Sequence, residues 1–168
     1  MQKKLEYPEY MSEITDSLSG AGIFLNSSYK NEANTMTIGW ANFGVMWGLP
    51  VATVAVRYTR HTYELINKSG VFTISIPSQN ALKKELAFCG SKSGRNLDKF
   101  KETGLTPLAG RKVDVPVIGE CGMHFECKVI YKQAMEPALI DAKIDDKFYS
   151  GNDFHVLFYG EILENYSI

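Results

Sequence analysis

Short runs of apolar residues, some alternating with polar ones and some continuous, divide the chain into predicted strands. Asn34 to Phe43 alternates in part and is rich in Thr, Ile and Trp, which favours a strand. Val51 to Val56 is a continuous run of β-branched and small residues, typical of a buried strand. After the polar stretch Arg57 to Thr62, a short helix is predicted at Tyr63 to Lys68. The rest of the predicted fold is built around this stretch.

The remaining pattern predicts more strands and few helices. Strands are expected at 23–26, 71–77, 120–131 (the longest) and 154–163, with short extended pieces at 104–108 and 113–118. Helices are expected at 9–18 and at 80–88, the second capped by Ser78 and carrying an i, i+4 pair of Leu82 and Leu86. Residues 27–33 are expected to form a turn, and 136–146 a loop or short helix.

These elements predict a mainly β, mainly antiparallel barrel. The strands cluster at both ends of the chain, so the βαβ alternation of a parallel sheet is not sustained. Closing the sheet into a barrel with inserted helices also removes exposed sheet edges. With 168 residues and no internal repeat or linker, residues 1–168 are expected to form a single domain.

The segment from Gly44 to Pro50 is predicted to be a loop, because glycine and proline punctuate it. It nevertheless carries two large apolar residues, Met46 and Trp47. Such residues cover either a partner subunit or a ligand ring, or they form a small local core. The sequence leaves these alternatives open.

Composition narrows the functional classes. Apolar residues make up 45% of the chain and charged residues 22%, and the net charge is -1. This balance gives no basic surface for nucleic acid and no polybasic anchor for a membrane. The longest apolar runs are far shorter than the roughly 20 residues of a membrane helix. The N-terminal residues lack the apolar segment of a signal peptide, so a cytoplasmic location is expected.

The three cysteines are expected to be reduced thiols. Cys121, His124 and Cys127 superficially resemble a metal site, but only three candidate ligands cluster there. In a strand, His124 would also point away from both cysteines. We therefore expect no metal.

Several common catalytic motifs are missing from the sequence. No Gly-x-Gly-x-x-Gly follows a strand, and neither a Walker-type Gly-Lys-Thr nor a Gly-x-Ser-x-Gly elbow occurs. His61, His124 and His155 lie far apart, without ligand spacing. Dinucleotide-fold, hydrolytic and metal chemistry are therefore disfavoured.

An anion site is the remaining chemical feature. The amides at the start of the Tyr63 helix suit a phosphate, and Arg57 and Arg60 add charged donors. Thr59 and Thr62 add hydroxyls at the place where a helix N-cap belongs. The alternative is that Thr62 only caps the helix and the arginines are solvated.

Four motifs, taken in order and spacing, resemble the flavin reductase-like family, particularly its flavoredoxin-type members. They are NTMTIGW at 34–40, RYTRHT at 57–62, SGRNLDKF at 93–100 and HVLFYGE at 155–161. The resemblance extends from about Gly20 to Leu163. Each motif is weak alone, whereas the ordered set is fairly specific.

The resemblance implies a split β-barrel, a homodimer and noncovalently bound FMN, with FAD less favoured. It implies a cofactor site made of Asn34, Thr35, Met36, Thr37, Trp40, Val54, Ala55, Val56, Arg57, Tyr58, Thr59, Thr62, Ser93, Gly94, Lys99 and Phe100. Residues 34–37 would line the isoalloxazine with Trp40 close by, and 54–59 would follow the ribityl chain and phosphate. Arg57 and Thr62 would bind the phosphate. Ser93, Gly94, Lys99 and Phe100 would belong to a loop closing over the cofactor.

His155 matches the family's histidine near the open face of the flavin, where a nicotinamide docks, and is the candidate catalytic residue. Family members often have an acid directly before this histidine, whereas here Phe154 separates it from Asp153. Structural roles stay open for some of these residues: Met36 and Trp40 as core, Lys99 as a solvated side chain, His155 as a strand residue.

Three functions remain as alternatives. The first is an FMN-dependent oxidoreductase that takes electrons from NAD(P)H or another donor and passes them to flavin, ferric iron or a redox protein partner. The second is a flavoprotein electron carrier that does not turn over nicotinamide. The third is a non-catalytic flavin- or haem-binding barrel.

Overall fold

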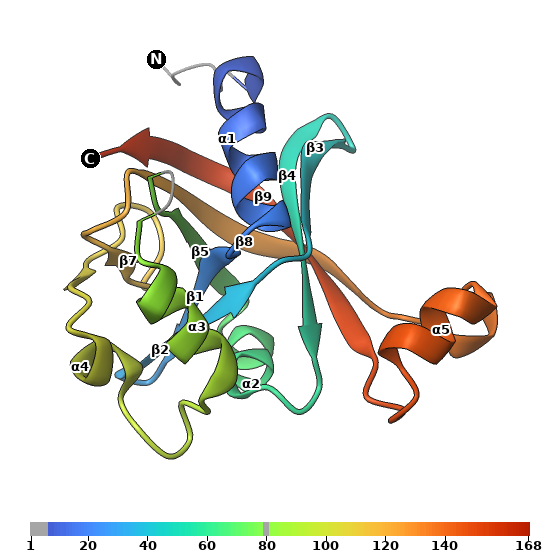
Figure 1. Ribbon diagram of the computed structural model, residues 1–168. Helices are drawn as coiled ribbons and strands as arrows, with labels where there is room; N and C mark the ends of the chain where they lie inside the picture. The colour runs from blue at the N-terminus through green and yellow to red at the C-terminus, as the bar shows by residue number, and fades with distance from the viewer. Residues whose placement is uncertain (1–6, 79–80) are drawn as a thin grey trace.

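The computed structural model describes residues 7–78 and 81–168, and a strongly curved antiparallel sheet dominates it (Figure 1). The strands are β1 (Ile23–Tyr29), β2 (Glu32–Ile38), β3 (Ala41–Met46), β4 (Leu49–Arg57), β5 (Val71–Ile76), β8 (Met123–Ala134) and β9 (His155–Ser167). They are ordered β2-β1-β5-β8-β9-β4-β3, and every neighbouring pair is antiparallel. Pro107–Leu108 (β6) and Val117–Ile118 (β7) form a separate two-stranded ladder. The mainly β prediction is confirmed.

Five short α-helices and one 3-10 turn accompany the sheet in the described part of the chain. They are α1 (Tyr7–Ser19), α2 (His61–Ser69), α3 (Lys83–Ser91), α4 (Lys99–Thr103), a 3-10 turn (Pro137–Leu139) and α5 (Ala142–Phe148). Helices α3 and α4 contact β2, whereas α2 contacts β1, β2 and β4. Helix α2 ends at Gly70, which adopts the left-handed conformation with φ 72° and thereby closes the last turn.

The main core fills the space enclosed by the curved sheet. Its side chains come from α1, α2 and all seven strands, although Phe43 of β3 is only partly buried. A second cluster lies on the opposite face of β1, where Phe24 packs with residues of α3 and α4. Alternation along β1 explains the division, because Ile23 and Leu25 face the main core while Phe24 faces the helices.

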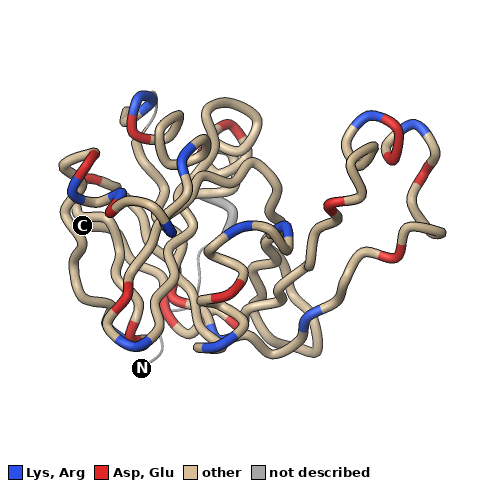
Figure 2. The backbone as a smooth tube through the Cα atoms, turned by 90° about the horizontal axis from the view of Figure 1, so that it is seen from below, with Lys and Arg blue, Asp and Glu red and all other residues tan. Residues whose placement is uncertain are grey.

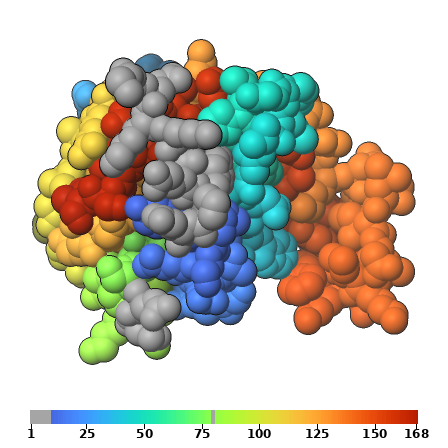
Figure 3. Space-filling model, turned by 90° about the horizontal axis from the view of Figure 1, so that it is seen from above, coloured from blue at the N-terminus to red at the C-terminus, as the bar shows by residue number. Residues whose placement is uncertain are grey.

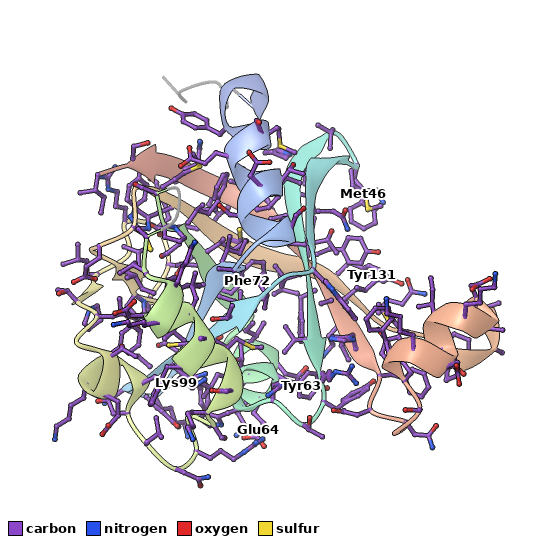
Figure 4. All side chains as sticks on the ribbon, viewed as in Figure 1. Met46, Tyr63, Glu64, Phe72, Lys99 and Tyr131 are labelled. Carbon is purple, nitrogen blue, oxygen red and sulfur yellow. The ribbon has the colours of Figure 1, made fainter. Side chains whose placement is uncertain are left out.

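Gly160 on β9 allows the barrel interior to be filled by a large ring. A Cβ at this position would lie 2.5 Å from Cζ of Phe72, which is fully buried on β5 and sits in the middle of the barrel (Figure 4). Such a distance is too short for any side chain. The glycine is therefore required by the close approach of the Phe72 ring.

One segment stands apart from the barrel. Residues from the end of β8 to the start of β9, including α5, extend away from the body in two perpendicular views (Figures 1 and 2). Seen from above, this segment forms a separate lobe beside the β3–β4 hairpin (Figure 3). We call residues 135–154 the arm. Charged residues of both signs are interspersed along the chain, the arm included (Figure 2).

The predicted strand from Asn34 to Phe43 is two strands, and the prediction of a single strand is wrong. The chain turns a corner at Gly39 and Trp40, so that β2 and β3 become opposite ends of the sheet. The predicted loop from Gly44 to Pro50 is also wrong. It is a tight β-hairpin whose two turn residues, Trp47 and Gly48, have φ of 54° and 73°. Two left-handed residues give the turn a twist that matches the strands.

Other boundaries also differ from the predictions. The turn expected at 27–33 shrinks to Lys30 and Asn31, again with positive φ, because the flanking residues pair as β1 and β2. Helix α3 begins at Lys83 after a left-handed Leu82, and the predicted start at Asn80 lies outside the described residues. The longest strand is β9, with 13 residues against 12 for β8. Among the described residues, no helix is long and apolar enough to cross a membrane.

Candidate functional site

A pocket of about 210 Å³ opens between the end of β2, the corner that follows it, the last residues of β4 and the start of β9. We call it the split pocket. It is lined by Met36, Thr37, Ile38, Gly39, Trp40, Ala55, Arg57, Arg60, Phe148 and His155. Six of these belong to the predicted site: Met36, Thr37, Trp40, Ala55, Arg57 and His155. Pairing of β4 with β9 explains part of the convergence, since it places Arg57 directly opposite His155.

One wall of the split pocket is a cluster of three rings. The Trp40 ring centroid lies 4.8 Å from that of His155 and 5.1 Å from that of Phe148, which meets it edge-on. Trp40 is 41% exposed, so it is not core, the role that the sequence had left open. Phe148 comes from the end of α5, and sequence analysis missed it because nothing in the local pattern ties the arm to this wall. This wall therefore offers an apolar ring surface to a ligand bound in the split pocket.

The opposite side of the split pocket offers backbone groups. Strand β2 is hydrogen-bonded to β1 along one side only, and no ladder runs along its other side in the described part of the chain. An edge strand presents unpaired N–H and C=O groups. Residues 36–39, at and just after this edge, line the pocket, so hydrogen-bond donors and acceptors stand beside apolar side chains. The Trp40 carbonyl, in contrast, already accepts a hydrogen bond from the Ala55 amide at 3.3 Å. The Thr37 hydroxyl itself donates to the Leu86 carbonyl at 2.7 Å.

Arg57 anchors the arm to the barrel. Its guanidinium donates to the carbonyl oxygens of Phe148, at 2.9 Å, and Asp153, and it lies 3.9 Å from the Asp153 carboxylate. That carboxylate also accepts a hydrogen bond from the Thr59 hydroxyl at 2.7 Å. The sequence alternative of a solvated Arg57 is therefore wrong. Its side chain holds Phe148 and His155 at the pocket while still lining it.

The start of α2 differs from the prediction. The helix begins at His61, and Arg60 occupies the N-cap position without a side-chain cap. Thr62 is inside the helix and fully buried, and its hydroxyl accepts a hydrogen bond from the Asn34 amide at 2.8 Å. The interpretation of Thr62 as an N-cap is wrong, because the side chain turns inward to meet Asn34. The first-turn amides of α2 are left without a side-chain cap, as an anion site requires.

Arg60 is the cation at this helix start that the structure leaves available. It lines the split pocket, and within the described residues no ion pair to its guanidinium occurs. Sequence analysis named it as a donor but did not place it among the cofactor-binding residues. Arg57 and Arg60 together make this end of the pocket positive.

The loop before α4 folds onto the same helix start. Arg95 donates to the Thr59 carbonyl at 2.8 Å and to the Glu64 carboxylate at 2.9 Å. Gly94 lies so close to Asn34 that a Cβ would stand 2.1 Å from Oδ1 of the asparagine. Ser93 accepts a hydrogen bond from the Arg95 amide at 3.3 Å. The predicted Gly94 therefore lies beside Asn34, and neither Ser93 nor Gly94 lines the pocket.

Lys99 and Phe100 are expected in a loop over the cofactor. The structure instead makes them the first two residues of α4. Lys99 is 4% exposed, which rules out a solvated side chain, and its ammonium donates to the Cys89 carbonyl at 2.8 Å (Figure 4). Burial lowers the pKa of Lys99 to about 8. Phe100 is buried in the second core cluster.

The remaining predicted residues surround the pocket without lining it. The side chains of Val54 and Val56 belong to the main core and do not line the pocket. Thr35 is fully buried, and its hydroxyl has no hydrogen-bond partner in the described structure. Tyr58 is 47% exposed and packs on Tyr63 with ring centroids 4.9 Å apart.

His155 is held neutral at the pocket. It is 8% exposed, and its Nδ1 lies 2.8 Å from the Tyr149 hydroxyl. Burial and the positive charge of Arg57 lower the pKa of His155 to about 4, with the Asp153 carboxylate acting in the opposite direction. Near neutral pH, the ring can donate or accept one hydrogen bond in the pocket without carrying charge.

This geometry fits a flat, polar-edged ring that carries an anionic tail. An apolar wall can cover one face of the ring, and the free edge of β2 can bond its polar rim. The uncapped start of α2 with Arg60 suits the anion. A flavin mononucleotide has these parts, and the residues present fit it.

Comparison with known proteins identifies the family. The flavin reductase like domain matches residues 18–166, and the chain belongs to this family. An uncharacterised protein of Pyrococcus abyssi is 32% identical over 82% of this chain and 67% of its own length. An uncharacterised protein of Archaeoglobus fulgidus is 31% identical over 64% of this chain, which spans 59% of that relative.

Solved structures agree on the fold. The flavoredoxin of Desulfovibrio vulgaris is 32% identical and superposes with a TM-score of 0.68, covering 88% of this chain and 69% of the flavoredoxin. The flavoredoxin of Methanosarcina acetivorans is 28% identical, with a TM-score of 0.66 over 87% of this chain and 67% of its own. An FMN-binding protein of Thermus thermophilus, 19% identical, shares the fold with a TM-score of 0.68 over 86% and 68% of the two chains. The split-barrel prediction is confirmed.

Proposed function

We propose that this protein is an FMN-dependent oxidoreductase that binds the cofactor in the split pocket. The observation that carries the proposal is the convergence of a free strand edge, an aromatic wall and an uncapped helix start on one cavity. Membership of the flavin reductase family and the likeness to two flavoredoxins support it. When bound, the flavin supplies the redox chemistry, while the protein supplies orientation and electrostatics.

Each part of the pocket has a task in this proposal. Backbone groups of residues 36–39 bond the polar rim of the ring and hold it in the pocket. Trp40 and Phe148 exclude water from one side of the cavity. Arg60 and the first amides of α2 bind the phosphate. Asn34 fixes this helix start through Thr62.

NAD(P)H is the proposed electron donor, and free flavin, ferric iron or a redox protein is the proposed acceptor. His155 is neutral and presents its ring beside Trp40, so it can hydrogen-bond an uncharged nicotinamide amide without repelling a cationic ring. An electron carrier without nicotinamide turnover is the alternative. Both functions use the same cofactor site. They differ only in whether a nicotinamide binds at the aromatic wall of the pocket.

The test is reconstitution followed by rapid reduction. We expect the purified protein to bind FMN, identified by mass after extraction, and mixing with NADH or NADPH under anaerobic conditions to bleach its visible absorbance. Bleaching by dithionite but by neither nicotinamide would favour the electron carrier. A colourless protein that ignores added FMN would overturn the proposal for both functions.

We further propose that the protein forms a homodimer through an apolar surface patch on the β3–β4 hairpin and β8. The patch consists of Val45, Met46, Trp47 and Tyr131, which are 75%, 41%, 61% and 44% exposed. Trp47 packs edge-on against Tyr131 at 5.9 Å, and Figure 4 shows Met46 and Tyr131 on the same side of the barrel. Adjacent large apolar residues on a surface mark an interaction site.

Trp47→Ser is expected to weaken the dimer, because it removes the largest apolar side chain of the patch without touching the core. Sizing chromatography at decreasing protein concentration should show the variant dissociating at a concentration about tenfold or more higher than the unmodified protein. Leu139→Ser is the matched control, since Leu139 is 83% exposed on the arm, outside the patch. Equal elution of all three proteins at every concentration would reject the patch.

A further inference from the structure

The hydroxyl of Tyr149 lies between two groups that compete for its single proton. It is 2.8 Å from Nδ1 of His155 and 3.1 Å from Sδ of Met135. A neutral imidazole nitrogen is a strong acceptor, whereas a thioether sulfur is a weak one. Both distances are within hydrogen-bonding range for their atoms, so the strength of the acceptor decides, and it favours donation to His155. Nδ1 then carries no proton, and the ring proton must be on Nε2.

Packing fixes the Tyr149 ring, so the hydroxyl oxygen stays beside His155 and Met135. It is 3% exposed and stacks on Phe154 at 4.9 Å with the two planes only 19° apart. The Arg57 guanidinium lies over it at 5.2 Å from the centroid. Because Arg57 also binds two arm carbonyls, the same residue fixes the arm and the tyrosine. The position of the hydroxyl is thus set by packing.

The charged groups near His155 keep the ring in a single neutral form. Arg57 and Arg60 oppose its protonation, whereas the Asp153 carboxylate favours it. Burial acts with the two arginines, and together they lower the pKa of His155 to about 4. Across the neutral range, the only freedom left to the imidazole is which nitrogen carries the proton.

We propose that Tyr149 is a positioning residue that holds His155 as the Nε2–H tautomer, so that the imidazole presents a hydrogen-bond donor to the split pocket. Nε2 has no partner among the described residues, and His155 lines the cavity, so this N–H is free for a ligand. Its partner must be a hydrogen-bond acceptor, and we propose a carbonyl oxygen, as in an amide or a conjugated ketone. A ligand that offers only N–H groups at this place would be rejected. The assignment of this oxygen to an electron donor or acceptor rests on the proposed function, whereas the tautomer does not.

Nitrogen-15 NMR of the histidine rings in the protein as purified tests the proposal directly. We expect His155, identified by loss of its signals in His155→Gln, to show an unprotonated Nδ1 and a protonated Nε2 at pH 7. In Tyr149→Phe, which keeps the ring and its stacking, the ratio of the tautomers should shift by up to about tenfold towards Nδ1–H. Tyr29→Phe is the control, because no hydrogen bond of the Tyr29 hydroxyl occurs among the described residues and its ring meets only Lys30 and Lys68.

A protonated Nδ1 in the unmodified protein would overturn the proposal, whether or not any variant folds. So would a tautomer ratio that is the same with and without the Tyr149 hydroxyl. In the FMN-loaded protein, Tyr149→Phe should raise the KM of the reductant about tenfold or less at unchanged FMN affinity, while Tyr29→Phe changes neither. Failure to bind FMN with the expected tautomer present would refute the proposed function and leave this assignment standing.

Discussion

Two loop regions of this barrel are each held by one charged side chain. We call the region at Glu126 the closed side, because the carboxylate of that side chain is satisfied by hydrogen bonds within the protein. On the side away from the split pocket, the Glu126 carboxylate accepts hydrogen bonds from the amides of Arg111, Lys112 and Val113, at 2.6–3.0 Å, and from the Tyr166 hydroxyl at 2.9 Å. Glu126 is fully buried. These four donors satisfy the carboxylate, and the backbone amides hold its pKa below the usual range despite burial.

The arm is held in a different way. Arg57 binds two of its carbonyls but remains partly exposed, with 23% of its side chain accessible. Beside it, Arg60 lacks an ion-pair partner in the described chain, and the start of α2 lacks a side-chain cap. Where the fold satisfies its polar groups completely, it gains stability. Where polar groups beside a cavity have no partner within the protein, their hydrogen-bond donors are available to a ligand.

The largest expected effect is on the closed side. Glu126→Gln replaces two acceptor oxygens by one and directs an NH₂ group at backbone amides, which should lower the free energy of unfolding by about 4 kcal/mol. Urea denaturation followed by circular dichroism measures this change. Glu164→Gln is the control, because the ion pairs of Glu164 among the described residues are the longer ones, to Arg111 and Lys112 at 3.6 and 3.9 Å. This substitution should cost under about 1 kcal/mol. Equal losses in the two variants would contradict the role of Glu126.

Acid should weaken both regions to a similar extent. Burial lowers the pKa of His124, on the closed side, and of His155, in the split pocket, from 6.5 to about 4. As the pH falls through 6.5 the unfolded chain binds a proton at each histidine before the folded protein does. The free energy of unfolding should therefore decrease between pH 6.5 and 4, by about 3 kcal/mol for each residue.

Denaturation at a series of pH values measures this slope, and His124→Gln should remove about half of it. A loss of stability that begins only below pH 4 would show that neither histidine titrates as described. In that case carboxylates such as Glu126, with its lowered pKa, would account for acid unfolding instead.

The smallest effect on stability and the clearest effect on binding are expected at Arg60. Arg60→Ala should change the free energy of unfolding by less than about 0.5 kcal/mol, because no ion pair is lost. FMN affinity should fall about tenfold, and its dependence on salt should weaken, because one phosphate donor is removed.

A fluorescence titration of FMN at two salt concentrations measures both quantities. Lys143→Ala on α5 is the matched control, since it removes one positive charge outside the pocket lining. Unchanged affinity in Arg60→Ala would place the phosphate elsewhere. Arg57→Ala with Thr62→Ala should also weaken FMN binding, but with a loss of stability, because Arg57 anchors the arm and Thr62 binds Asn34.

The sequence by itself determined most of the strands and named six of the residues that line the pocket. Val51 to Val56 could be assigned from its own composition, because an uninterrupted β-branched run has few alternatives to a buried strand. The four ordered motifs further indicated the family and therefore the split barrel. Local pattern was sufficient wherever a residue's role depends on its neighbours along the chain.

Tertiary structure decided which side chains remain free. From the sequence, Thr62 is interpreted as a helix cap, but Asn34 on β2 hydrogen-bonds its hydroxyl inside the protein. Lys99 is interpreted as solvated, but its ammonium donates a hydrogen bond to the Cys89 carbonyl. Phe148 and Tyr149 carry no signal at all, because only the pairing of β4 with β9 and the grip of Arg57 on the arm bring them to His155. Polar groups choose partners by distance in space, and a one-dimensional pattern does not contain those distances.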